Sequence, residues 1–323
     1  MALISASSYP GPPRYQWGGH LQTILPNIRR SQPLEYQRER LELADGDFLD
    51  LDWLATPAQD RLVILSHGLE GDSSRPYMVE AARFFFSQGY AVLAWHSRSC
   101  SGEMNRNPVL YSHGQSQDLA AVVEYAVAKQ PYQSIDLIGY SMGGNLTGKY
   151  LGLAGSGLPQ VVRCGVAFSA PCWIEHSVDA LERPGNWLYK RKFYRSLRAK
   201  AEQKEAQFPG LIDLAALDKF KVWRDFDRIV SAPLNGFETA EEFYAYASAA
   251  NFMGGTQVPL LLVNALNDPI IPVACTPVEL GRGHPLIHIE QPSQGGHVGF
   301  SRSQGRGSWM NERALAFMER QTV

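Results

Sequence analysis

The chain has 323 residues, of which 45% are hydrophobic and 19% are charged, and its formal net charge is −2 at pH 7. This length allows one large α/β domain or two ordinary ones, with enough apolar residues for a substantial core. The nearly balanced charge gives no general reason to expect a nucleic-acid partner. The four cysteines are widely spread without a C-x-x-C pair, which is typical of reduced thiols and argues against a disulfide framework or a zinc site.

No segment of the sequence predicts membrane insertion. Residues 1–19 contain neither a basic segment nor a continuous apolar run of signal-peptide length. No later stretch approaches the ~20 apolar residues that span a bilayer. We therefore expect a cytoplasmic chain without an integral membrane segment.

Apolar runs alternate with amphipathic segments along most of the chain. Residues 1–34 are rich in Pro, Gly and aromatics and are expected to form an irregular arm over the body, and residues 37–50 predict a hairpin with a glycine turn. Strands are predicted at residues 61–66, 89–95, 134–140, 164–169, 259–264 and 286–290, and helices at residues 76–88, 116–129 and 309–320. This alternation indicates the α/β class, with a mostly parallel central sheet flanked by helices.

The alternation stops between residues 173 and 255, where the sequence is aromatic, charged and predicted to be helical. Thr239-Ala240-Glu241-Glu242 fits a capping box that opens a helix to about Ala250. An insertion at this place would lie over the carboxyl ends of the strands, where ligands bind. We interpret residues 173–255 as a small helical cap on a single domain that spans residues 1–323. Its basic run is interpreted as a solvated helix face, with contact to anionic lipid head groups as the alternative: Lys190, Arg191, Lys192, Arg195, Arg198, Lys200 and Lys204.

The most informative motif is Gly139-Tyr140-Ser141-Met142-Gly143, which follows the apolar segment 135–138 and precedes a helix-like stretch. The pattern G-x-S-x-G in the order strand, sharp turn and helix is typical of the nucleophile elbow of α/β-hydrolases. Both flanking positions need glycine because side chains there would collide across so tight a turn. The turn lifts the hydroxyl clear of the sheet, close to the free N–H groups of the new helix. The motif predicts Ser141 as a nucleophile, against the alternative of an ordinary glycine-rich turn.

A serine nucleophile needs a base that a carboxylate orients, and in α/β-hydrolases the acid follows the serine and precedes the histidine. Asp268 comes directly after a predicted buried strand, with Pro269 behind it, so its side chain is expected in the cleft above the sheet. The alternative is that Asp268 and its neighbours only make a turn, which these residues favour. Asp136, inside the strand of the serine, and Asp179, early in the cap, are poorer candidates for the acid.

Only one of the eight histidines lies in a glycine-flanked loop between the last predicted strand and the closing helix, and this is His297 within Gly295–Gly299. Glycines on both sides allow the backbone to approach the site closely. This placement predicts His297 as the general base, against the alternative of a loop histidine without a role. The other histidines precede Ser141 or Asp268, or lie before or within the last strand: His20, His67, His96, His113, His176, His284 and His288.

Negative charge that develops on a substrate oxygen needs two preorganised N–H donors, each worth about 3 kcal/mol. The first donor is expected to be the amide of Met142, just after the nucleophile. The second is expected from the loop after the first parallel strand, His67–Gly71, where Leu69 supplies the amide and Gly68 lets the chain turn. His67 is interpreted as a structural hydrogen-bonding residue beneath this loop. An ordinary glycine turn is the alternative for the loop.

With these residues placed, the chain resembles the YheT-like branch of the α/β-hydrolases, a group of bacterial esterases akin to eukaryotic lipid and phospholipid esterases. The matching segments are Gly19–Ile24, His67–Gly71 through Tyr77, Ser99–Glu103, Gly139–Asn145, Gly236–Phe237, Asn264–Pro269 and Gly295–Gly299. The resemblance implies a carboxylic-ester hydrolase in which Ser141, Asp268 and His297 match the catalytic triad. It also implies that the segment 19–24 packs near the active site.

The sequence departs from this branch at one position. The branch usually has Arg-Gly-Cys-Ser-Gly, whereas this chain has Arg98-Ser99-Cys100-Ser101-Gly102. Serine at position 99 is expected to alter the loop beside the pocket without touching the triad. Cys100 is interpreted as a buried loop thiol and not as a second nucleophile, because the sequence pairs no basic group with it.

These residues predict a serine esterase that cleaves short-chain or lipid-derived esters through an acyl-enzyme, without a metal or organic cofactor. Two alternatives stay open: an acyltransferase that uses the same triad, and a non-catalytic protein of this fold that binds a small ligand under the cap. The expected partner is a small-molecule ester or lipid, and peripheral membrane contact stays open because a lipid substrate would bring the enzyme to a surface. The cap aromatics are expected to pack the cap, with an acyl pocket as the alternative: Trp173, Trp187, Tyr189, Phe193, Tyr194, Phe243 and Tyr244.

Overall fold

A nine-stranded sheet runs through the part of the chain that the computed structural model describes, residues 3–29, 31–303 and 307–321. Its strands are β1 (Leu3–Ile4), β2 (Gln37–Glu42), β3 (Phe48–Leu54), β4 (Arg61–Ser66), β5 (Ala91–Trp95), β6 (Ser134–Tyr140), β7 (Val162–Phe168), β8 (Leu260–Val263) and β9 (Ile287–Glu290). They are ordered β1-β9-β8-β7-β6-β4-β5-β3-β2. All neighbours from β1 to β5 pair in parallel, whereas β3 is antiparallel to both β5 and β2. The predicted parallel sheet is confirmed, and the predicted hairpin forms one of its edges.

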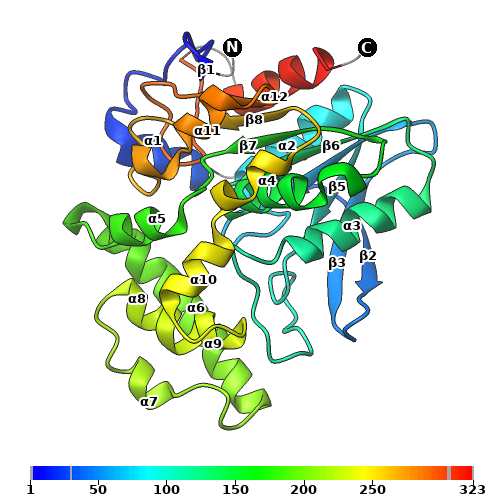
Figure 1. Ribbon diagram of the computed structural model, residues 1–323. Coiled ribbons are helices and arrows are strands. Elements are labelled where there is room, and N and C mark those ends of the chain that lie inside the picture. Colours follow the sequence, from blue (N-terminus) through cyan, green and yellow to red (C-terminus); the bar gives the residue numbers. More distant parts are fainter. Residues whose placement is uncertain (1–2, 30, 304–306, 322–323) are drawn as a thin grey trace.

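Helices cover both faces of this sheet and form a separate layer at its carboxyl edge (Figure 1). They are α1 (Gly18–Asn27), α2 (Pro76–Ser87), α3 (Ser116–Lys129), α4 (Met142–Ala154), α5 (Ile174–Leu181), α6 (Trp187–Gln207), α7 (Leu214–Leu217), α8 (Trp223–Phe226), α9 (Ala232–Leu234), α10 (Ala240–Ala247), α11 (Val278–Gly283) and α12 (Trp309–Glu319). In Figure 1, α6 to α10 lie together at the bottom, and both ends of the chain lie at the top.

Strand β4 shows why the central strands are continuous apolar runs. Its side chains alternate between the two faces, so Leu62 and Ile64 join the core that contains α3 and α4 residues, and Val63 and Leu65 join the core that contains α2 and α12 residues. All four side chains are fully buried. At about 2 kcal/mol for each buried aliphatic side chain, the two cores hold the sheet in a fixed position beneath the site.

The helical segment 173–255 packs on the first of these cores. Trp223, Phe226 and Phe243 belong to the same buried cluster as Leu62 of the sheet. The predicted capping box is confirmed, because the Thr239 hydroxyl accepts the backbone N–H of residue 242 at 3.2 Å, although helix α10 ends at residue 247 and not near 250. A shared core fixes this segment against the sheet.

The solvated face predicted for the basic run is wrong in the second half of α6. Lys204 is fully buried and donates to the carbonyl oxygens of Asn105 and Asn107 at 2.6 and 2.5 Å. Lys200, one turn earlier, pairs with Glu70 at 2.7 Å. Residues four apart lie on one helix face, and here that face points inward. Basic composition alone did not distinguish the inner face of α6 from the outer one.

The irregular arm predicted for residues 1–34 is also wrong in two places. Strand β1 extends the sheet beside β9, and helix α1 covers the loops at the carboxyl edge. Helix α1 begins at two glycines, has no side-chain cap at Trp17 and contains Pro26, so it lacks the usual local signals of a helix. Its contacts with distant loops stabilise it instead.

Candidate active site

Ser141 lies in a tight turn between β6 and α4, with φ 55° and ψ −119°. A Cβ atom at Gly139 would lie 2.1 Å from the carbonyl oxygen of Gly143, and a Cβ atom at Gly143 would lie 2.2 Å from the carbonyl oxygen of Ser66. Neither position can therefore hold a side chain without moving backbone. This is the steric requirement that the motif predicted.

The imidazole of His297 connects the other two predicted side chains. Its Nε2 lies 2.9 Å from the Ser141 Oγ, and its Nδ1 lies 2.9 Å from the Asp268 Oδ2. A neutral imidazole that donates from Nδ1 to the carboxylate presents Nε2 as an acceptor for the serine hydroxyl. The structure thus brings together three side chains that lie far apart in the sequence. Asp268 follows Ser141 by 127 residues, and His297 follows Asp268 by 29 residues.

Asp268 is buried and makes two kinds of contact. Its Oδ1 accepts the backbone N–H groups of Ile270 and Ile271 at 2.8 and 2.9 Å, while its Oδ2 faces His297. The first contacts form the turn that was the alternative interpretation of this residue. The turn is therefore confirmed, and the same turn fixes the carboxylate that faces the imidazole.

The two other carboxylates considered from the sequence are engaged elsewhere. Asp136 lies 2.5 Å from a guanidinium nitrogen of Arg163, and Asp179 lies 3.1 Å from one of Arg224. Burial raises the pKa of Asp136, an effect that Arg163 opposes. Neither carboxylate contacts an imidazole.

Two hydroxyl groups fix the backbone of the loop that carries His297. The Thr23 hydroxyl of α1 accepts the His297 N–H at 2.9 Å, and the Ser169 hydroxyl, just after β7, accepts the Val298 N–H at 2.9 Å. Val298 itself has φ 51°, an uncommon value for a β-branched residue. These hydrogen bonds hold a strained loop in one conformation.

Gln22 of α1 joins the loop of the acid to the loop of the base. Its side-chain oxygen accepts from the Asn267 side chain at 2.9 Å and from the Gly295 N–H at 2.8 Å. The packing is close, because a Cβ atom at Gly19 would lie 1.9 Å from the Asn267 carbonyl oxygen and one at Gly299 would lie 2.0 Å from the Gln22 carbonyl oxygen. The position that the resemblance implied for residues 19–24 is confirmed.

The loop after β4 lies directly against the serine. A Cβ atom at Gly68 would lie 3.1 Å from the Cβ of Ser141, and the Gly68 N–H donates to the Tyr77 hydroxyl at 3.0 Å. Within the described ranges, no acceptor is hydrogen bonded to the amide of Leu69 or of Met142. Two free N–H groups beside a serine hydroxyl are the arrangement that stabilises a negative oxygen.

Glu70, the next residue of this loop, is bound to the cap. Lys200 of α6 lies 2.7 Å from its carboxylate, and the Ser196 hydroxyl of the same helix also donates to it. Tyr111 donates to the carboxylate at 2.5 Å and accepts the Glu70 N–H at 2.9 Å. Burial alone would raise the pKa of Glu70, but Lys200 and the hydroxyl donors bring this pKa below its usual range. The carboxylate is therefore ionised and turned toward α6.

His67 is confirmed as a structural residue. Its Nδ1 donates to the Gly68 carbonyl oxygen at 2.7 Å, and its Nε2 accepts the Ser97 N–H at 3.0 Å. Burial lowers the pKa of His67 to about 4, so the ring is neutral at pH 7. A neutral ring with both nitrogens engaged supports the loop and has no free nitrogen for proton transfer.

The departure at position 99 has a visible structural consequence. Ser99 has φ 63°, a left-handed conformation that glycine adopts at no cost. Its hydroxyl compensates by bonding to the Asn105 side chain at 2.5 Å and accepting the Asn105 N–H at 3.1 Å. Cys100 next to it is a partly buried thiol, and the expectation that no basic group accompanies it is wrong, since the Lys200 Nζ lies 3.3 Å from its sulfur. Burial raises the pKa of Cys100 to about 11.

A cavity of about 450 Å³ contains both the serine and the imidazole. Helices α1 and α6 form two of its walls, and the loop after β4 forms a third. Its lining includes Thr23, Ile24, Ile28, Leu69, Glu70, Arg75, Tyr77, Ser141, Leu188, Tyr189, Lys192, Phe193 and His297. Tyr189 and Phe193 thus line the pocket, which corrects the expectation for these two cap aromatics, whereas the ring of Tyr194 stacks on Phe220 inside the cap.

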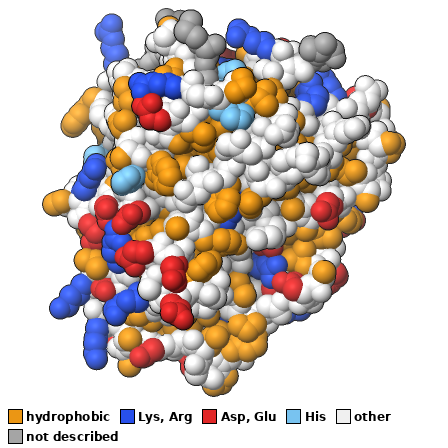
Figure 2. All heavy atoms as spheres, in the orientation of Figure 1, with side chains coloured by type: hydrophobic (Ala, Val, Ile, Leu, Met, Phe, Trp, Pro, Cys, Tyr) orange, Lys and Arg blue, Asp and Glu red, His pale blue; other side chains and the backbone are white. Residues whose placement is uncertain are grey.

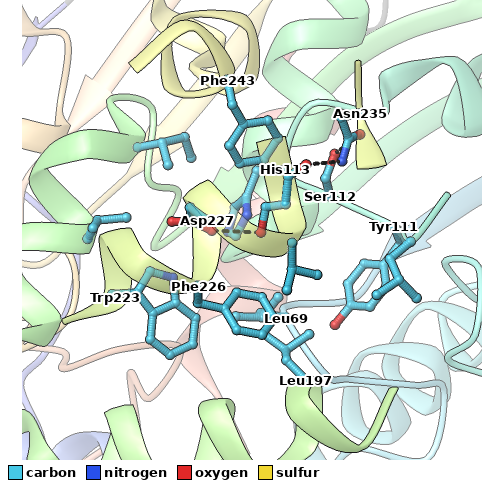
Figure 3. A pocket seen from close by; sticks show the side chains of 15 residues that line it. Leu69, Tyr111, Ser112, His113, Leu197, Trp223, Phe226, Asp227, Asn235 and Phe243 are labelled. Atoms are coloured by element: carbon cyan, nitrogen blue, oxygen red, sulfur yellow. Dashed lines mark hydrogen bonds between the residues drawn. The ribbon is translucent and has the colours of Figure 1, made fainter. Parts of the chain in front are cut away.

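Two smaller cavities lie on the cap side of the site. A small cavity of about 50 Å³ touches Ser141, His297 and apolar side chains such as Ile174 and Val178. A further cavity of about 50 Å³ shares Leu69, His113, Ile174, Val178 and Trp223 with it. Figure 3 shows this deeper cavity between cap residues Trp223, Phe226 and Phe243 and the loop residue Leu69. The walls of both cavities are mainly apolar, which suits a hydrocarbon chain.

The described residues form neither a metal centre nor a membrane-spanning helix. In the ranges 3–29, 31–303 and 307–321, no three His, Cys, Asp or Glu side chains are placed to hold a metal ion. Among the helices of the same ranges, none has the length and apolar character needed to cross a bilayer.

Known proteins share this fold and much of this sequence. Residues 61–300 match the family described as alpha/beta hydrolase fold. "Putative esterase YheT" of Escherichia coli is 34% identical over 87% of this chain and 84% of its own length. "Phospholipase ABHD3" of Mus musculus is 29% identical over 98% of this chain and 77% of its own length. The Pyrococcus furiosus esterase Pf2001 has a similar fold, with a TM-score of 0.58 and 18% identity over 88% of this chain and 91% of its own.

The family match over residues 61–300 and the 34% identity to the Escherichia coli relative show the family of this chain. The chain belongs to the alpha/beta hydrolase fold family, and the resemblance to its YheT-like branch is confirmed.

The contact between Glu70 and α6 predicts a stability effect. Lys200→Met leaves a buried carboxylate without its cation, so we expect the free energy of unfolding to fall by about 3 kcal/mol. Urea denaturation of the variant measures this loss. Lys200→Met combined with Glu70→Gln removes the buried charge and should recover most of the stability; a double variant as unstable as the single one would contradict the role of the pair.

The buried carboxyl of Asp227, in the cap, predicts that the free energy of unfolding depends on pH. Burial raises the pKa of this carboxyl to about 6, although Ser231 and Tyr244 donate to it. The folded state therefore holds the proton more tightly than the unfolded state, and folding loses stability as pH rises from about 4 through 6. Asp227→Asn cannot ionise and should gain about 2 kcal/mol on wild type between pH 4 and pH 7.5. Unfolding measured at both pH values tests this, and a difference that does not change with pH would contradict it.

Proposed function

We propose that the chain hydrolyses carboxylic esters through an acyl-enzyme on Ser141, with His297 as the general base and Asp268 as the acid that orients it. One observation carries this proposal: the continuous contact of Asp268, His297 and Ser141 through two distances of 2.9 Å. A serine hydroxyl is a weak nucleophile at neutral pH, and an imidazole at this distance removes its proton as it attacks.

The first half of the reaction forms the acyl-enzyme. The Ser141 Oγ attacks the ester carbonyl carbon, and its proton moves to the Nε2 of His297. The carbonyl oxygen becomes negative and accepts hydrogen bonds from the amides of Leu69 and Met142. When the carbon–oxygen bond of the ester breaks, the imidazolium returns its proton to the leaving alcohol. Asp268 stabilises the imidazolium without taking its proton.

The second half of the reaction repeats these steps with water. His297 takes a proton from a water molecule, whose oxygen attacks the acyl carbon, and then returns the proton to the Ser141 Oγ as the acid leaves. Water can reach the serine because the large cavity has surface residues such as Ile28 and Leu188 on its lining. This access favours hydrolysis over transfer of the acyl group to another acceptor.

The substrate class we propose is a lipid-derived or short-chain ester. The two small apolar cavities take the acyl chain, and the larger cavity takes the alcohol portion. Relatives with lipid substrates in their names, the mouse phospholipase and a yeast monoacylglycerol lipase 23% identical over 80% of this chain, support this class. The segment 173–255 serves as the cap over the site, and the chain works as one catalytic unit.

Labelling with a fluorophosphonate probe tests the nucleophile. We expect wild-type protein to be labelled and Ser141→Ala to be unlabelled, because the probe forms a covalent bond only with an activated serine. Hydrolysis of p-nitrophenyl esters should be lost in the same variant. A wild-type protein that neither reacts with the probe nor cleaves esters would favour a non-catalytic ligand-binding protein.

Replacing the acid tests the triad separately. Asp268→Asn should fold, because an amide oxygen can still accept the N–H groups of Ile270 and Ile271, yet kcat should fall by about 10⁴ because the imidazole loses its orientation and charge partner. Circular dichroism and steady-state kinetics measure the two properties. Near-normal kcat in this variant would assign the role to another acid.

A further inference from the structure

Helix α1 buries two polar residues and leaves apolar ones nearer the surface. Gln22 and Thr23 are its buried residues, whereas Ile24 is half-buried and Ile28, just after the helix, is 68% exposed. Trp17, directly before α1, is 76% exposed. Ile24 and Ile28 are four residues apart and so lie on one face, and Trp17 lies at the N-cap of the same helix. A surface helix normally shows the opposite pattern, so this outer face is built for an apolar environment.

Exposed apolar side chains concentrate around this helix. Ten large hydrophobic side chains are exposed in the described part of the chain. Six of them belong to the α1 region, the start of α6 or the loop before Asp268: Tyr15, Trp17, Ile28, Trp187, Leu188 and Leu266. Exposed apolar side chains that gather in one region mark an interaction surface, whereas single ones do not.

The start of α6 lies against α1, so the two groups form one surface. The His20 ring stacks on the Tyr189 ring with centroids 5.8 Å apart, and its Nδ1 lies 3.2 Å from the Tyr189 hydroxyl. A Cβ atom at Gly185 would lie 3.3 Å from the same imidazole. Trp187 and Leu188 are between these two contact points along the chain. We call Trp17, Ile24, Ile28, Trp187 and Leu188 the apolar rim.

The apolar rim borders the opening of the cavity that contains Ser141. Ile24 and Ile28 from α1 and Leu188 from α6 line that cavity. In Figure 2, hydrophobic, basic and acidic side chains all reach the surface along the left side, where Figure 1 places α1 and α5. A substrate that enters the cavity therefore crosses the apolar rim first.

Cations accompany the apolar rim. Lys192 and Arg75 line the same cavity, and within the described ranges no carboxylate lies within ion-pair distance of Lys192. The charge of Arg75 is partly neutralised by Asp72, whose carboxylate lies 3.6 Å from the guanidinium group. Burial lowers the pKa of Lys192, and the like charge of the nearby Arg75 lowers it further. Glu70, the acidic residue of the lining, is already paired with Lys200.

We propose that the apolar rim, with Lys192 and Arg75 beside it, binds the surface of an anionic lipid bilayer and presents the Ser141 cavity to it. Tryptophan side chains favour the boundary between head groups and acyl chains, and each nearby cation contributes about 1 kcal/mol of attraction to anionic lipid. A second copy of the chain fits this surface less well. Two-fold pairing would bring the same cations face to face.

The binding test is independent of catalysis. Ser141→Ala protein is mixed with vesicles of phosphatidylcholine, alone or with phosphatidylglycerol, and bound protein is measured by co-sedimentation. We expect binding to the mixed vesicles that weakens with salt. Trp17→Ala with Trp187→Ala should weaken it about tenfold or more, because two interfacial side chains are lost. Leu153→Ala is the matched control, since this half-exposed leucine at the end of α4 lies outside the rim and should not change binding.

Two further measurements test the contribution of charge to binding and the alternative of a dimer. Lys192→Met should weaken binding to the mixed vesicles about fivefold, which is the effect of one interfacial cation, while Arg191→Met, an exposed neighbour outside the cavity lining, should weaken it less. Absence of vesicle binding, or binding that the double tryptophan variant leaves unchanged, would overturn the proposal. So would a dimer, detected by light scattering, that the tryptophan variant dissociates.

Hydrolysis of a soluble short-chain ester separates this proposal from the catalytic one. In protein with Ser141 intact, the double tryptophan variant should retain this activity, because neither tryptophan lines the cavity. Vesicle binding without ester hydrolysis would leave the surface in place and remove the catalytic proposal. Ester hydrolysis without vesicle binding would remove the proposed bilayer surface and leave the catalytic proposal in place.

Discussion

The tight turn at Ser141 is the constraint around which the site is arranged. A non-glycine residue with φ 55° costs of order 1–3 kcal/mol, and it persists where the surroundings over-determine the backbone. Here the Ser141 N–H donates to the Phe168 carbonyl oxygen of β7 at 2.8 Å, while the glycines at positions 139 and 143 pack against backbone on both sides. The strain is thus stored between two central strands of the sheet. The hydroxyl consequently points out of the carboxyl edge.

The order of the strands then determines which residues can lie near this hydroxyl. β4 and β7 flank β6, so the loop with Leu69 lies on one side of the serine and Ser169 on the other. β8 and β9 come next and end near Asp268 and the loop of His297. Because all these strands run parallel, their carboxyl ends meet at one edge. Residues far apart in the chain therefore become neighbours without any long excursion of the backbone.

Local signals in the sequence were sufficient for strands β2 to β9 of the sheet and for the positions of the three central side chains. The apolar runs, the glycines around residue 141 and the turn after β8 each act over a few residues, which is the range that a single sequence reveals. Helix α1 was missed because its stability comes from contacts such as Gln22 with Gly295, 273 residues away. The pairing of Lys200 with Glu70 was missed for the same reason, at a separation of 130 residues. Only the resemblance to a family carried information over such distances.

Helix α6 connects the two ends of this arrangement. Its first residues, Trp187 and Leu188, belong to the proposed bilayer surface, and three turns later Ser196 and Lys200 hold the carboxylate of Glu70. Glu70 directly follows the residue whose amide we assign to the negative oxygen. A helix is stiff along its axis, so a displacement of its first turn moves the anchor of that loop as well. Helix α6 therefore connects the surface that would bind a lipid to the loop whose amide would stabilise the reacting oxygen.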